Sequence, residues 1–213
     1  MTVRRVVIVG AGGHARVIAA ILAQMSDVQM IGVADRTEAA LGEVVGPTRI
    51  TSTIAQLPAL RRDGAEWAAL AVGDNRERAD LSRELQAIGF RLIVVRHPHA
   101  IVEPGVVIGD GAVICAGAIL GAETRVGPGA IVNTGAIVDH EGRVGAHAHV
   151  GPGARVAGRV TIGEGTFVGA GVTIRDRVSI GEWSVIGAGA VVVADVPPGV
   201  VAYGIPARVH RDA

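Results

Sequence analysis

Aliphatic side chains recur at every sixth position along the second half of this chain. The period holds without a gap from Val102 to Val192, and a small or β-branched residue follows each aliphatic position by four residues. A period of six fits neither a helix nor an alternating strand, and a fixed period repeated many times is typical of a solenoid. Glycine commonly comes directly after the aliphatic residue, as it does where backbones approach closely. The pattern predicts a parallel β-helix in which each six-residue unit supplies one short strand.

Three such units make one triangular coil, so residue i is expected to stack on residue i+18, with the aliphatic side chains inward. Each coil then contacts mainly its neighbours. The usual chirality rule for parallel crossovers favours a right-handed coil. The sixteen aliphatic positions are Val102, Ile108, Ile114, Leu120, Val126, Val132, Val138, Val144, Val150, Val156, Ile162, Val168, Ile174, Ile180, Ile186 and Val192.

The first half of the chain has a different pattern, in which short apolar runs alternate with helical periodicity. We expect strands at 6–9, 30–34, 48–51, 67–72 and 91–95, and helices at 16–25, 54–60 and 76–88. A strand, a glycine-rich turn, a helix and a second strand that ends in an acid are the opening of a Rossmann-like unit. Gly10, Gly12 and Ala15 fit the relaxed fingerprint G-x-G-x-x-A, and Asp35 is the acid. Such a turn presents backbone N–H groups to phosphate, although a tight turn without a ligand is the alternative.

A full dinucleotide-binding domain has two mononucleotide halves, whereas this α/β region has the size of one. That size favours a nucleotide or nucleotide-sugar over a nicotinamide cofactor. We therefore expect two domains, a half-Rossmann-like α/β domain at 1–97 and a β-helix at 98–213, with the boundary in the Arg-His-Pro-His run at 96–99.

Composition narrows the classes of function. The 213 residues include 20 basic and 20 acidic side chains and only 2% aromatic residues. With zero net charge, the chain shows no basic excess that would attract nucleic acid or an anionic membrane. Because it has few aromatic residues, we do not expect a surface on which nucleic-acid bases stack. No stretch has the length of a signal core or a membrane span. One cysteine, Cys115, excludes an internal disulfide and fits a reducing, cytoplasmic compartment.

One turn of the predicted β-helix carries a candidate catalytic pair. His140 follows the aliphatic Val138 by two residues, and its neighbours at minus and plus 18 are the small residues Ala122 and Gly158. Such neighbours would leave the imidazole in a recess, where it could serve as a general base. The adjacent Glu141 could fix the tautomer of the ring. A solvated surface histidine explains the same position equally well.

The chain also resembles a known subfamily in four places. These are the Gly-Ala-Gly-Gly-His-Ala run at 10–15, the hexads after a His-Pro junction, Asn133-Thr134 with His140-Glu141, and the ending Val-Pro-Pro-Gly…Gly-Ile-Pro-Ala-Arg at 196–208. They resemble the hexapeptide-repeat acetyltransferases of sialic acids (O-acetylation) and of nucleotide-sugars (N-acetylation), such as the enzymes of UDP-N-acetylbacillosamine and perosamine synthesis. The resemblance implies a left-handed β-helix, acetyl-CoA as co-substrate, no metal, and a homotrimer with each site between two β-helices. Apart from this resemblance, the Pro and Gly residues of the tail predict an irregular segment that caps the solenoid.

The resemblance also implies roles for individual residues. His140 is the general base and Glu141 raises its basicity. The positions that match the acetyl-CoA site are His149, Gly169, Ala170, Gly187 and Ala188. The positions that match the nucleotide-sugar site are Gly12, Gly13, His14, Asp35, Arg36 and Gly73. Some members of the subfamily have a second acidic residue at the position of Arg36. Which residue of this chain contacts the base or the ribose of the nucleotide is therefore left open.

These expectations give one mechanism and leave several alternatives. An amino group of a nucleotide-linked sugar attacks the thioester directly, with His140 accepting its proton; Cys115 is a poor nucleophile candidate, since the hexad count places it on another side of the prism. The alternatives are O-acetylation of sialic acid or a related sugar, a γ-class carbonic anhydrase, a small dehydrogenase and a scaffold without chemistry. The sequence identifies neither the sugar, nor the nucleotide, nor the roles of Asn133 and His147.

Overall fold

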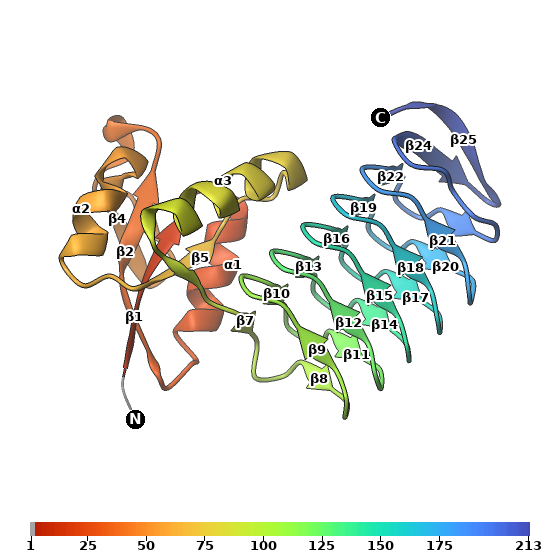
Figure 1. The fold of residues 1–213 in the computed structure, drawn as a ribbon, viewed down its shortest axis with the longest axis horizontal. Coiled ribbons are helices and arrows are strands. Elements are labelled where there is room, and N and C mark those ends of the chain that lie inside the picture. Colours follow the sequence, from red (N-terminus) through yellow and green to blue (C-terminus); the bar gives the residue numbers. More distant parts are fainter. Residues whose placement is uncertain (1–2) are drawn as a thin grey trace. The chain divides into compact units, whose positions relative to one another are not determined.

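The computed structural model describes residues 3–213 and divides into two compact units, one ending at Pro98 and one starting at His99. Each unit is described by itself. The first is an α/β unit and the second is a coil of short parallel strands (Figure 1).

The α/β unit contains one sheet with the order β3-β4-β2-β1-β5-β6. All its pairs are parallel except β3 with β4. The elements are β1 Arg4–Val9, α1 Gly13–Leu22, β2 Val28–Asp35, the 3-10 turn η1 Glu38–Ala40, β3 Val44–Val45, β4 Thr48–Thr53, η2 Ile54–Gln56, α2 Leu57–Arg62, β5 Trp67–Leu70, α3 Asn75–Ile88, β6 Arg91–Leu92 and β7 Val95–Arg96.

The sheet is buried on both faces, as parallel sheets usually are. Val7 and Val9 of β1 pack with Leu57 of α2 and with Leu81 and Leu85 of α3. Because successive side chains of a strand point to opposite faces, Val6 and Ile8 lie on the other face, and all four valine and isoleucine side chains are fully buried. The unbroken apolar run of β1 follows from this double burial.

Several expected element bounds in this unit were wrong; the expected helix 54–60, for example, is η2 followed by α2, and β5 ends at Leu70. Helix α1 begins at Gly13, three residues before the expected start, because Gly12 already serves as its N-cap residue with extended backbone. The expected strand 91–95 is two short strands, β6 and β7, separated by Ile93 and Val94. Neither η1 nor β3 was expected; they contain only three and two residues.

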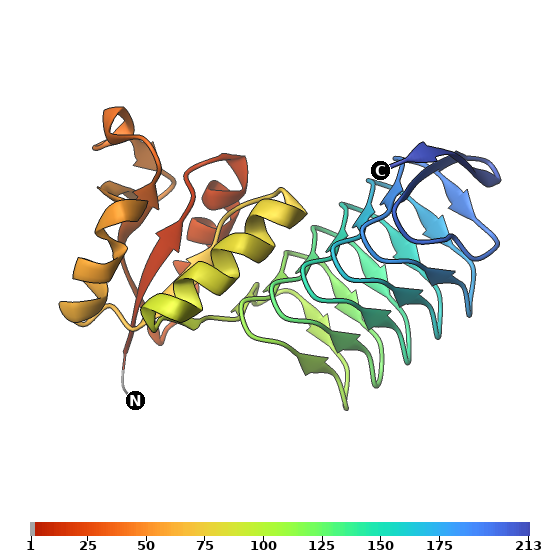
Figure 2. The ribbon, with the colours of Figure 1, turned by 45° about the horizontal axis from the view of Figure 1, so that its top comes forward.

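The second unit is the predicted parallel β-helix (Figure 2), with sixteen two-residue strands from β8 to β23. Each strand pairs in parallel with the corresponding strand of the next coil, as Ile119-Leu120 does with Ile137-Val138. The strands are β8 Ile101–Val102, β9 Val107–Ile108, β10 Val113–Ile114, β11 Ile119–Leu120, β12 Arg125–Val126, β13 Ile131–Val132, β14 Ile137–Val138, β15 Arg143–Val144, β16 His149–Val150, β17 Arg155–Val156, β18 Thr161–Ile162, β19 Phe167–Val168, β20 Thr173–Ile174, β21 Ser179–Ile180, β22 Val185–Ile186 and β23 Val191–Val192.

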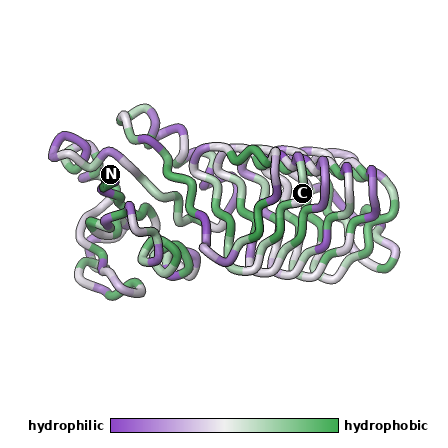
Figure 3. The backbone as a smooth tube through the Cα atoms, turned by 90° about the horizontal axis from the view of Figure 1, so that it is seen from below, coloured by the Kyte–Doolittle hydropathy of each residue, from purple (hydrophilic) through white to green (hydrophobic). Residues whose placement is uncertain are grey.

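The second residue of each strand is the inward aliphatic position. Every such residue from Ile114 to Val192 is buried in one continuous core, with Val102 and Ile108 partly buried at its first coil. Figure 3 shows the corresponding hydrophobic segments in green, repeated from coil to coil. The small residue four positions later, such as Ala136 or Ala154, is also fully buried. The six-residue period in the sequence therefore identifies the residues of the hydrophobic core.

Each coil has three turns, and from Val102 to Ile186 the third residue after each inward aliphatic residue has left-handed backbone. This position is usually glycine, as at Gly135 and Gly153, but it also accepts larger residues at a cost in backbone strain. The six exceptions are Glu123, Glu141, His147, Arg159, Arg177 and Trp183.

The C-terminal segment is a β-hairpin, so the expectation of an irregular tail was wrong. Strand β24, Val200–Gly204, pairs in parallel with β22 and antiparallel with β25, Ala207–Asp212. Figures 1 and 2 show this hairpin at the end of the coil stack. Tyr203 stacks on His210 across the hairpin with ring centres 3.6 Å apart. The hairpin covers the edge of β22, which would otherwise be the terminal strand of its sheet.

None of the helices within residues 3–213 combines the length and the apolar character that crossing a membrane requires.

Candidate functional site

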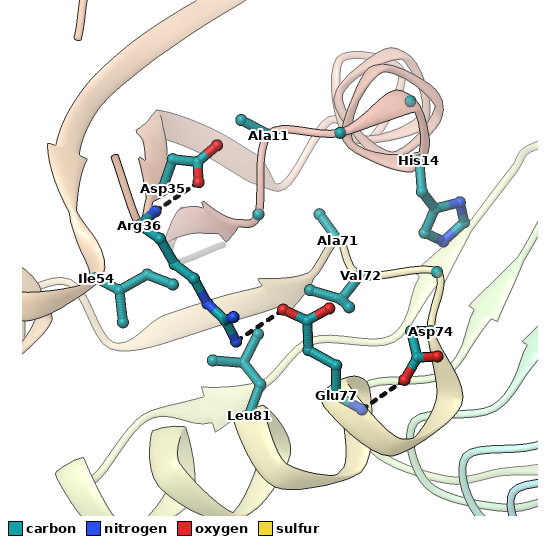
Figure 4. Close-up of a pocket in the computed structure, with 14 residues that line it drawn as sticks. Ala11, His14, Asp35, Arg36, Ile54, Ala71, Val72, Asp74, Glu77 and Leu81 are labelled. Carbon is teal, nitrogen blue, oxygen red and sulfur yellow. Dashed lines mark hydrogen bonds and ion pairs between the residues drawn. The ribbon is translucent and has the colours of Figure 1, made fainter. Parts of the chain in front are cut away.

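A cavity of about 360 Å³ lies at the carboxyl ends of the strands of the α/β unit. It opens where the sheet order changes direction between β1 and β5, which is where open α/β sheets bind ligands. Figure 4 shows the cavity with the residues from β2, α1 and α3 around it. All six residues that the sequence suggested for a nucleotide-sugar line it, namely Gly12, Gly13, His14, Asp35, Arg36 and Gly73.

The glycine turn forms one wall of the cavity and exposes backbone. A Cβ atom at Gly12 or Gly13 would meet nothing within 4 Å, so that side of the turn is open. At Gly10 the backbone is left-handed, and a Cβ atom would lie 3.0 Å from the carbonyl oxygen of Ala71. Gly10 is thus required by the turn, whereas Gly12 and Gly13 keep space open beside the N-terminus of α1, where a phosphate is favoured.

Two basic side chains are shielded from solvent near this wall: Arg78, and His14, which lines the cavity and is partly buried. Arg78 is fully buried, and its guanidinium donates to the carbonyl oxygens of Val72 and Gly73 at 3.2 and 3.0 Å and to Asn75 Oδ1 at 2.8 Å. Burial lowers the pKa of Arg78 to about 10, and Asp74 partly offsets this. Burial, together with the charge of Arg78, lowers the pKa of His14 to about 4, so this ring is neutral at pH 7.

The cavity is also lined by residues that the sequence did not single out, among them Ile54, Asp74, Glu77 and Leu81. Glu77 Oε1 forms an ion pair with Arg36 Nη2 at 2.7 Å. The backbone N–H of Glu77 donates to Asp74 Oδ1 at 2.8 Å, which caps α3. An acid three positions after an Asp N-cap is a recognisable helix start. Its partner Arg36 follows a different strand, far away along the chain, and could not be paired with it from sequence.

The β-helix brings His140 and Glu141 together at one turn. His140 Nδ1 lies 3.2 Å from Glu141 Oε2. A carboxylate only accepts hydrogen bonds, so Nδ1 carries the proton and Nε2 is left as an acceptor. The ring is about half exposed. Its coil neighbours are those predicted: the backbone N–H of Glu141 donates to Ala122, and the carbonyl of His140 accepts from Arg159, next to Gly158.

Gly158 provides the space in which the imidazole lies. A Cβ atom at this position would be 2.5 Å from His140 Nε2 and 2.7 Å from Cε1, closer than any real contact. Gly158 is buried, and its φ is not in the left-handed range. Glycine at this position is therefore needed to leave space for the ring of His140, and not for the backbone conformation of the turn.

Arg159 is part of this arrangement and was missed by the sequence reasoning. Its Nε donates to Glu141 Oε2 at 2.6 Å. Hydrogen bonds from Arg159 and then from His140 hold the pKa of Glu141 below its usual range. The signal was available, because Arg159 follows Glu141 by one full coil and coil neighbours are in contact. Both residues have left-handed backbone, with φ of 61° and 56°.

The residues suggested for acetyl-CoA lie along a different edge of the prism. The turns at 169–171 and 187–189 stack directly, and the N–H of Gly189 donates to the carbonyl of Ala170 at 2.8 Å. A Cβ atom at Gly169 would meet the backbone of Ala188 at 2.6 Å. This edge follows strands β16, β19 and β22, whereas His140 follows β14. Within one chain the structure does not bring these residues beside His140.

His149 lies on the face next to that edge and is nearly buried. Its Nε2 is 3.0 Å from Asn133 Nδ2, and its ring meets Phe167 edge-on at 5.1 Å. His147 packs on Gly129, where a Cβ atom would be 2.4 Å from its Nδ1. The structure thus gives Asn133 and His147 packing positions that the sequence left open.

Cys115 is fully buried, and burial raises its pKa to about 11. A thiol of that kind is protonated at neutral pH and is a poor nucleophile. Among residues 3–213, no group of three His, Cys, Asp or Glu side chains lies close enough together to hold a metal ion.

Comparisons with known proteins agree on both units. Residues 5–85 match the PglD N-terminal domain, residues 141–176 and 159–194 match the bacterial transferase hexapeptide (six repeats), and residues 99–122 match the hexapeptide repeat of succinyl-transferase. No curated protein sequence matches the chain.

Several solved structures are similar over nearly the whole length. Perosamine N-acetyltransferase from Caulobacter crescentus, solved as a histidine-to-asparagine variant with CoA and GDP-perosamine, is 39% identical, with 97% of each chain covered and a TM-score of 0.92. The acetyltransferase domain of PglB from Neisseria gonorrhoeae, solved with acetyl coenzyme A, is 35% identical, with 98% of this chain and 100% of that one covered and a TM-score of 0.92. WeeI from Acinetobacter baumannii shares the fold at 22% identity, over 99% of this chain and 100% of its own, with a TM-score of 0.84.

Proposed function

Because this chain belongs to the nucleotide-sugar acetyltransferases of the hexapeptide-repeat family, we propose that His140 is the general base of its reaction. The chain is an acetyl-CoA-dependent sugar N-acetyltransferase that acts on the amino group of a nucleotide-linked sugar. The observation that carries the role of His140 is the contact of its Nδ1 with Glu141, at a turn where Gly158 leaves space for the ring.

The proposed reaction is a direct transfer. The sugar amine attacks the carbonyl carbon of the acetyl thioester and forms the new C–N bond, while His140 Nε2 accepts the proton that the amine loses. The tetrahedral intermediate then collapses, the C–S bond breaks, and the CoA thiolate leaves and takes up the proton from the imidazolium of His140. Glu141 stabilises the imidazolium that forms, and backbone N–H groups at the turns stabilise the oxyanion of the tetrahedral intermediate.

We assign the two substrates to different units. The cavity with Gly12, Gly13, His14, Asp35, Arg36 and Gly73 holds the nucleotide-sugar, because it combines an open glycine turn with a helix N-terminus. His149 and the stacked turns with Gly169, Ala170, Gly187 and Ala188 hold acetyl-CoA.

A homotrimer completes the site in this proposal. The two prism edges that carry His140 and the acetyl-CoA positions are separated by one sheet within a chain, so a second copy has to supply one of them. Ile101, Ile119 and Ile137 stack on the outer face of that sheet, and Ile101 is 52% exposed. Such an apolar row favours burial between copies. Light scattering that gives a monomer at micromolar concentration would contradict this assembly.

We also propose a cytoplasmic location, since the only cysteine forms no internal disulfide. The acetylated nucleotide-sugar is a substrate of the kind that glycan biosynthesis consumes.

The test of the activity is release of the CoA thiol in the presence of a panel of nucleotide-linked amino sugars. Release that requires the amino group, with a product heavier by one acetyl group, is expected. Release only with sialic acid or another sugar hydroxyl would indicate the O-acetyltransferase alternative. No release with any sugar would contradict both.

Gly12→Val tests the assignment of ligands to units. A valine there would occupy the open side of the glycine turn, so the KM for the nucleotide-sugar should rise while the KM for acetyl-CoA stays nearly unchanged. The opposite pattern would show that the two ligands are assigned to the wrong units.

A further inference from the structure

The cavity of the α/β unit has two ends of different chemistry. The Gly10–Gly13 turn and the N-terminus of α1 form an end lined by backbone, which suits the diphosphate. The other end has Arg36, Ile54, Glu77 and Leu81 (Figure 4). In a Rossmann-like unit the residues just beyond the second strand lie on the nucleoside side of the phosphates. Arg36 directly follows β2, so this second end is where a base or ribose would lie.

The polar groups of this end are held in place before any ligand binds. Glu77 lies in the first turn of α3, and its backbone N–H is fixed by Asp74. Its Oε1 pairs with Arg36 Nη2 at 2.7 Å, and the backbone N–H of Arg36 donates to the Asp35 carboxylate. Both side chains of the Arg36–Glu77 pair remain accessible, with 68% and 39% of their surface exposed. The apolar Ile54 and Leu81 line the same end and offer apolar contact for a ring.

The pair presents guanidinium donors next to carboxylate acceptors. A carboxylate has two oxygens with about four acceptor positions, so the bond to Arg36 does not exhaust Glu77. A base that complements the pair needs two adjacent donors for the carboxylate and an acceptor beside them for the guanidinium.

Guanine alone among the common bases has this edge. Its N1–H and N2–H₂ groups are adjacent donors, and O6 is an acceptor next to N1–H. Uracil and thymine have a single N3–H between two carbonyl oxygens, one of which would face the carboxylate. Cytosine and adenine have one amino group beside a ring nitrogen that accepts. A mismatch leaves a polar group of the site unpaired, which costs more than a lost contact.

We propose that the Arg36–Glu77 pair selects a guanine nucleotide, so that the substrate is a GDP-linked amino sugar. This inference rests on the proposed function, which requires a nucleotide-sugar in this cavity but does not specify its base. Glu77 would accept from N1–H and N2–H₂, and Arg36 would donate to O6.

The first measurement compares five nucleoside diphosphates by calorimetry on the full chain, without a sugar. GDP should bind at least about tenfold more tightly than UDP, CDP and dTDP, as one bidentate contact to a base edge provides. IDP differs from GDP only by lacking the N2 amino group, and it should bind about tenfold more weakly than GDP. Equal binding of IDP and GDP, or tighter binding of UDP, would overturn the proposal.

Glu77→Gln then tests the residue. The change keeps the size of the side chain and removes its charge, so the preference for GDP over IDP should shrink to about twofold or less. Glu43→Gln is the matched control, because Glu43 is an exposed glutamate of the same unit and lines neither this cavity nor the adjoining hollow that Arg36 and Glu77 share with Glu84. The control should keep the full preference. Equal GDP/IDP ratios in the wild type and Glu77→Gln would contradict the assignment to Glu77.

Two further readouts separate the possible failures. Acetyl-CoA binding by each variant, which depends on the β-helix, checks that the chain is folded. If UDP binds most tightly and acetyl transfer from acetyl-CoA to a UDP-linked amino sugar occurs, the guanine assignment fails and the proposed function stands. If none of the five diphosphates binds while acetyl-CoA does, the nucleotide assignment of the cavity fails as well.

Discussion

The two candidate sites of this chain are built in different ways. In the β-helix, residues in contact are one coil apart, so His140 with Gly158 and Glu141 with Arg159 follow from counting. In the α/β unit, the cavity is lined from four strand ends and two helices, and Arg36 after β2 meets Glu77 of α3 with no period that links them. A repeat therefore makes a site predictable at the level of side chains, whereas an open sheet makes only its position predictable.

The largest effect is expected at His140, in the candidate site of the β-helix. His140→Ala should lower turnover by about 10²–10⁴-fold, the usual contribution of a general base. Steady-state kinetics with both substrates measure the loss.

Binding of acetyl-CoA and the oligomeric state serve as controls for His140→Ala and should not change. If the variant keeps near-normal turnover, the base lies elsewhere, and His14 and His149 are the next candidates.

The second effect is a loss of stability at acid pH that we expect in the α/β unit. His14 has its pKa lowered from 6.5 to about 4 by burial and by Arg78. Its neutral form is favoured in the folded state, so the stabilisation is present above pH 6.5 and is lost as pH falls from 6.5 to 4. Linkage gives a loss of at most about 3 kcal/mol in the free energy of unfolding of the α/β unit. In His14→Gln this part of the loss should disappear.

Each unit contains one tryptophan, which allows the two to be followed separately. Trp67 lies in β5 and Trp183 in the β-helix. Denaturation of the Trp183→Phe variant, followed by the fluorescence of Trp67, reports on the α/β unit alone. An equal loss of stability in His14→Gln and its parent between pH 7 and 4 would contradict the role of His14.

The sequence predicted the two sites to different depths for a physical reason. The six-residue period identified the inward residues and the coil neighbours of His140, whereas Gly169 and Gly187 were suggested only by the family resemblance. The period did not reveal the β24–β25 hairpin, because pairing there depends on the exposed edge of the last coil. In the α/β unit the glycine turn and Asp35 located the cavity, but the fully buried Arg78 could not be predicted, since a charged residue on a helix is usually exposed.

The third effect tests the space beside His140. Gly158→Ala places a methyl group 2.5 Å from the unperturbed position of Nε2, so the ring has to move. A misplacement of about 1 Å can cost about 10²-fold in rate, and we expect a loss of about 10- to 100-fold in turnover, with acetyl-CoA binding unchanged. Ala122→Gly, at the equivalent position one coil before His140, removes a methyl group without a clash and should stay within about twofold of wild type.

If Gly158→Ala turns over at the wild-type rate, the ring position in the structure does not matter for the reaction. Because alanine occurs at the equivalent turn position in Ala122 and Ala170, the backbone should accept the change, and a lower melting temperature is not expected.

The fourth effect is smaller and concerns the partner of Glu141. Arg159→Ala should lower turnover by a few fold, because Glu141 loses the hydrogen bond that holds it beside His140. The pKa of Glu141 should return toward its usual value, so the carboxylate loses its charge at a higher pH than in wild type and activity at pH 4–5 should fall further. In a Glu141→Gln background, Arg159→Ala should add little.

Arg177→Ala is the matched control for Arg159→Ala. Arg177 lies one coil further along the same edge with the same left-handed backbone, and it lies beside Asp176 at 3.8 Å. Its removal changes the backbone strain and surface charge equally but leaves Glu141 untouched. Equal kinetics for the two alanine variants would show that Arg159 acts only through general charge.

The smallest effect is expected at Cys115, and it distinguishes direct transfer from an acetyl-enzyme. The thiol is buried, and its pKa is raised to about 11. Cys115→Ala should therefore keep turnover within about twofold, with a loss of stability of about 1 kcal/mol from the vacated volume. Iodoacetamide should not label the native wild-type chain at pH 8, although it labels the unfolded chain.

In a rapid-mixing experiment, acetyl-CoA without an amino sugar should give no burst of CoA thiol, because direct transfer needs both substrates in one complex. A burst equal to the enzyme concentration that disappears in Cys115→Ala would instead require a covalent intermediate on this thiol, and the base assigned to His140 would then have to act on it.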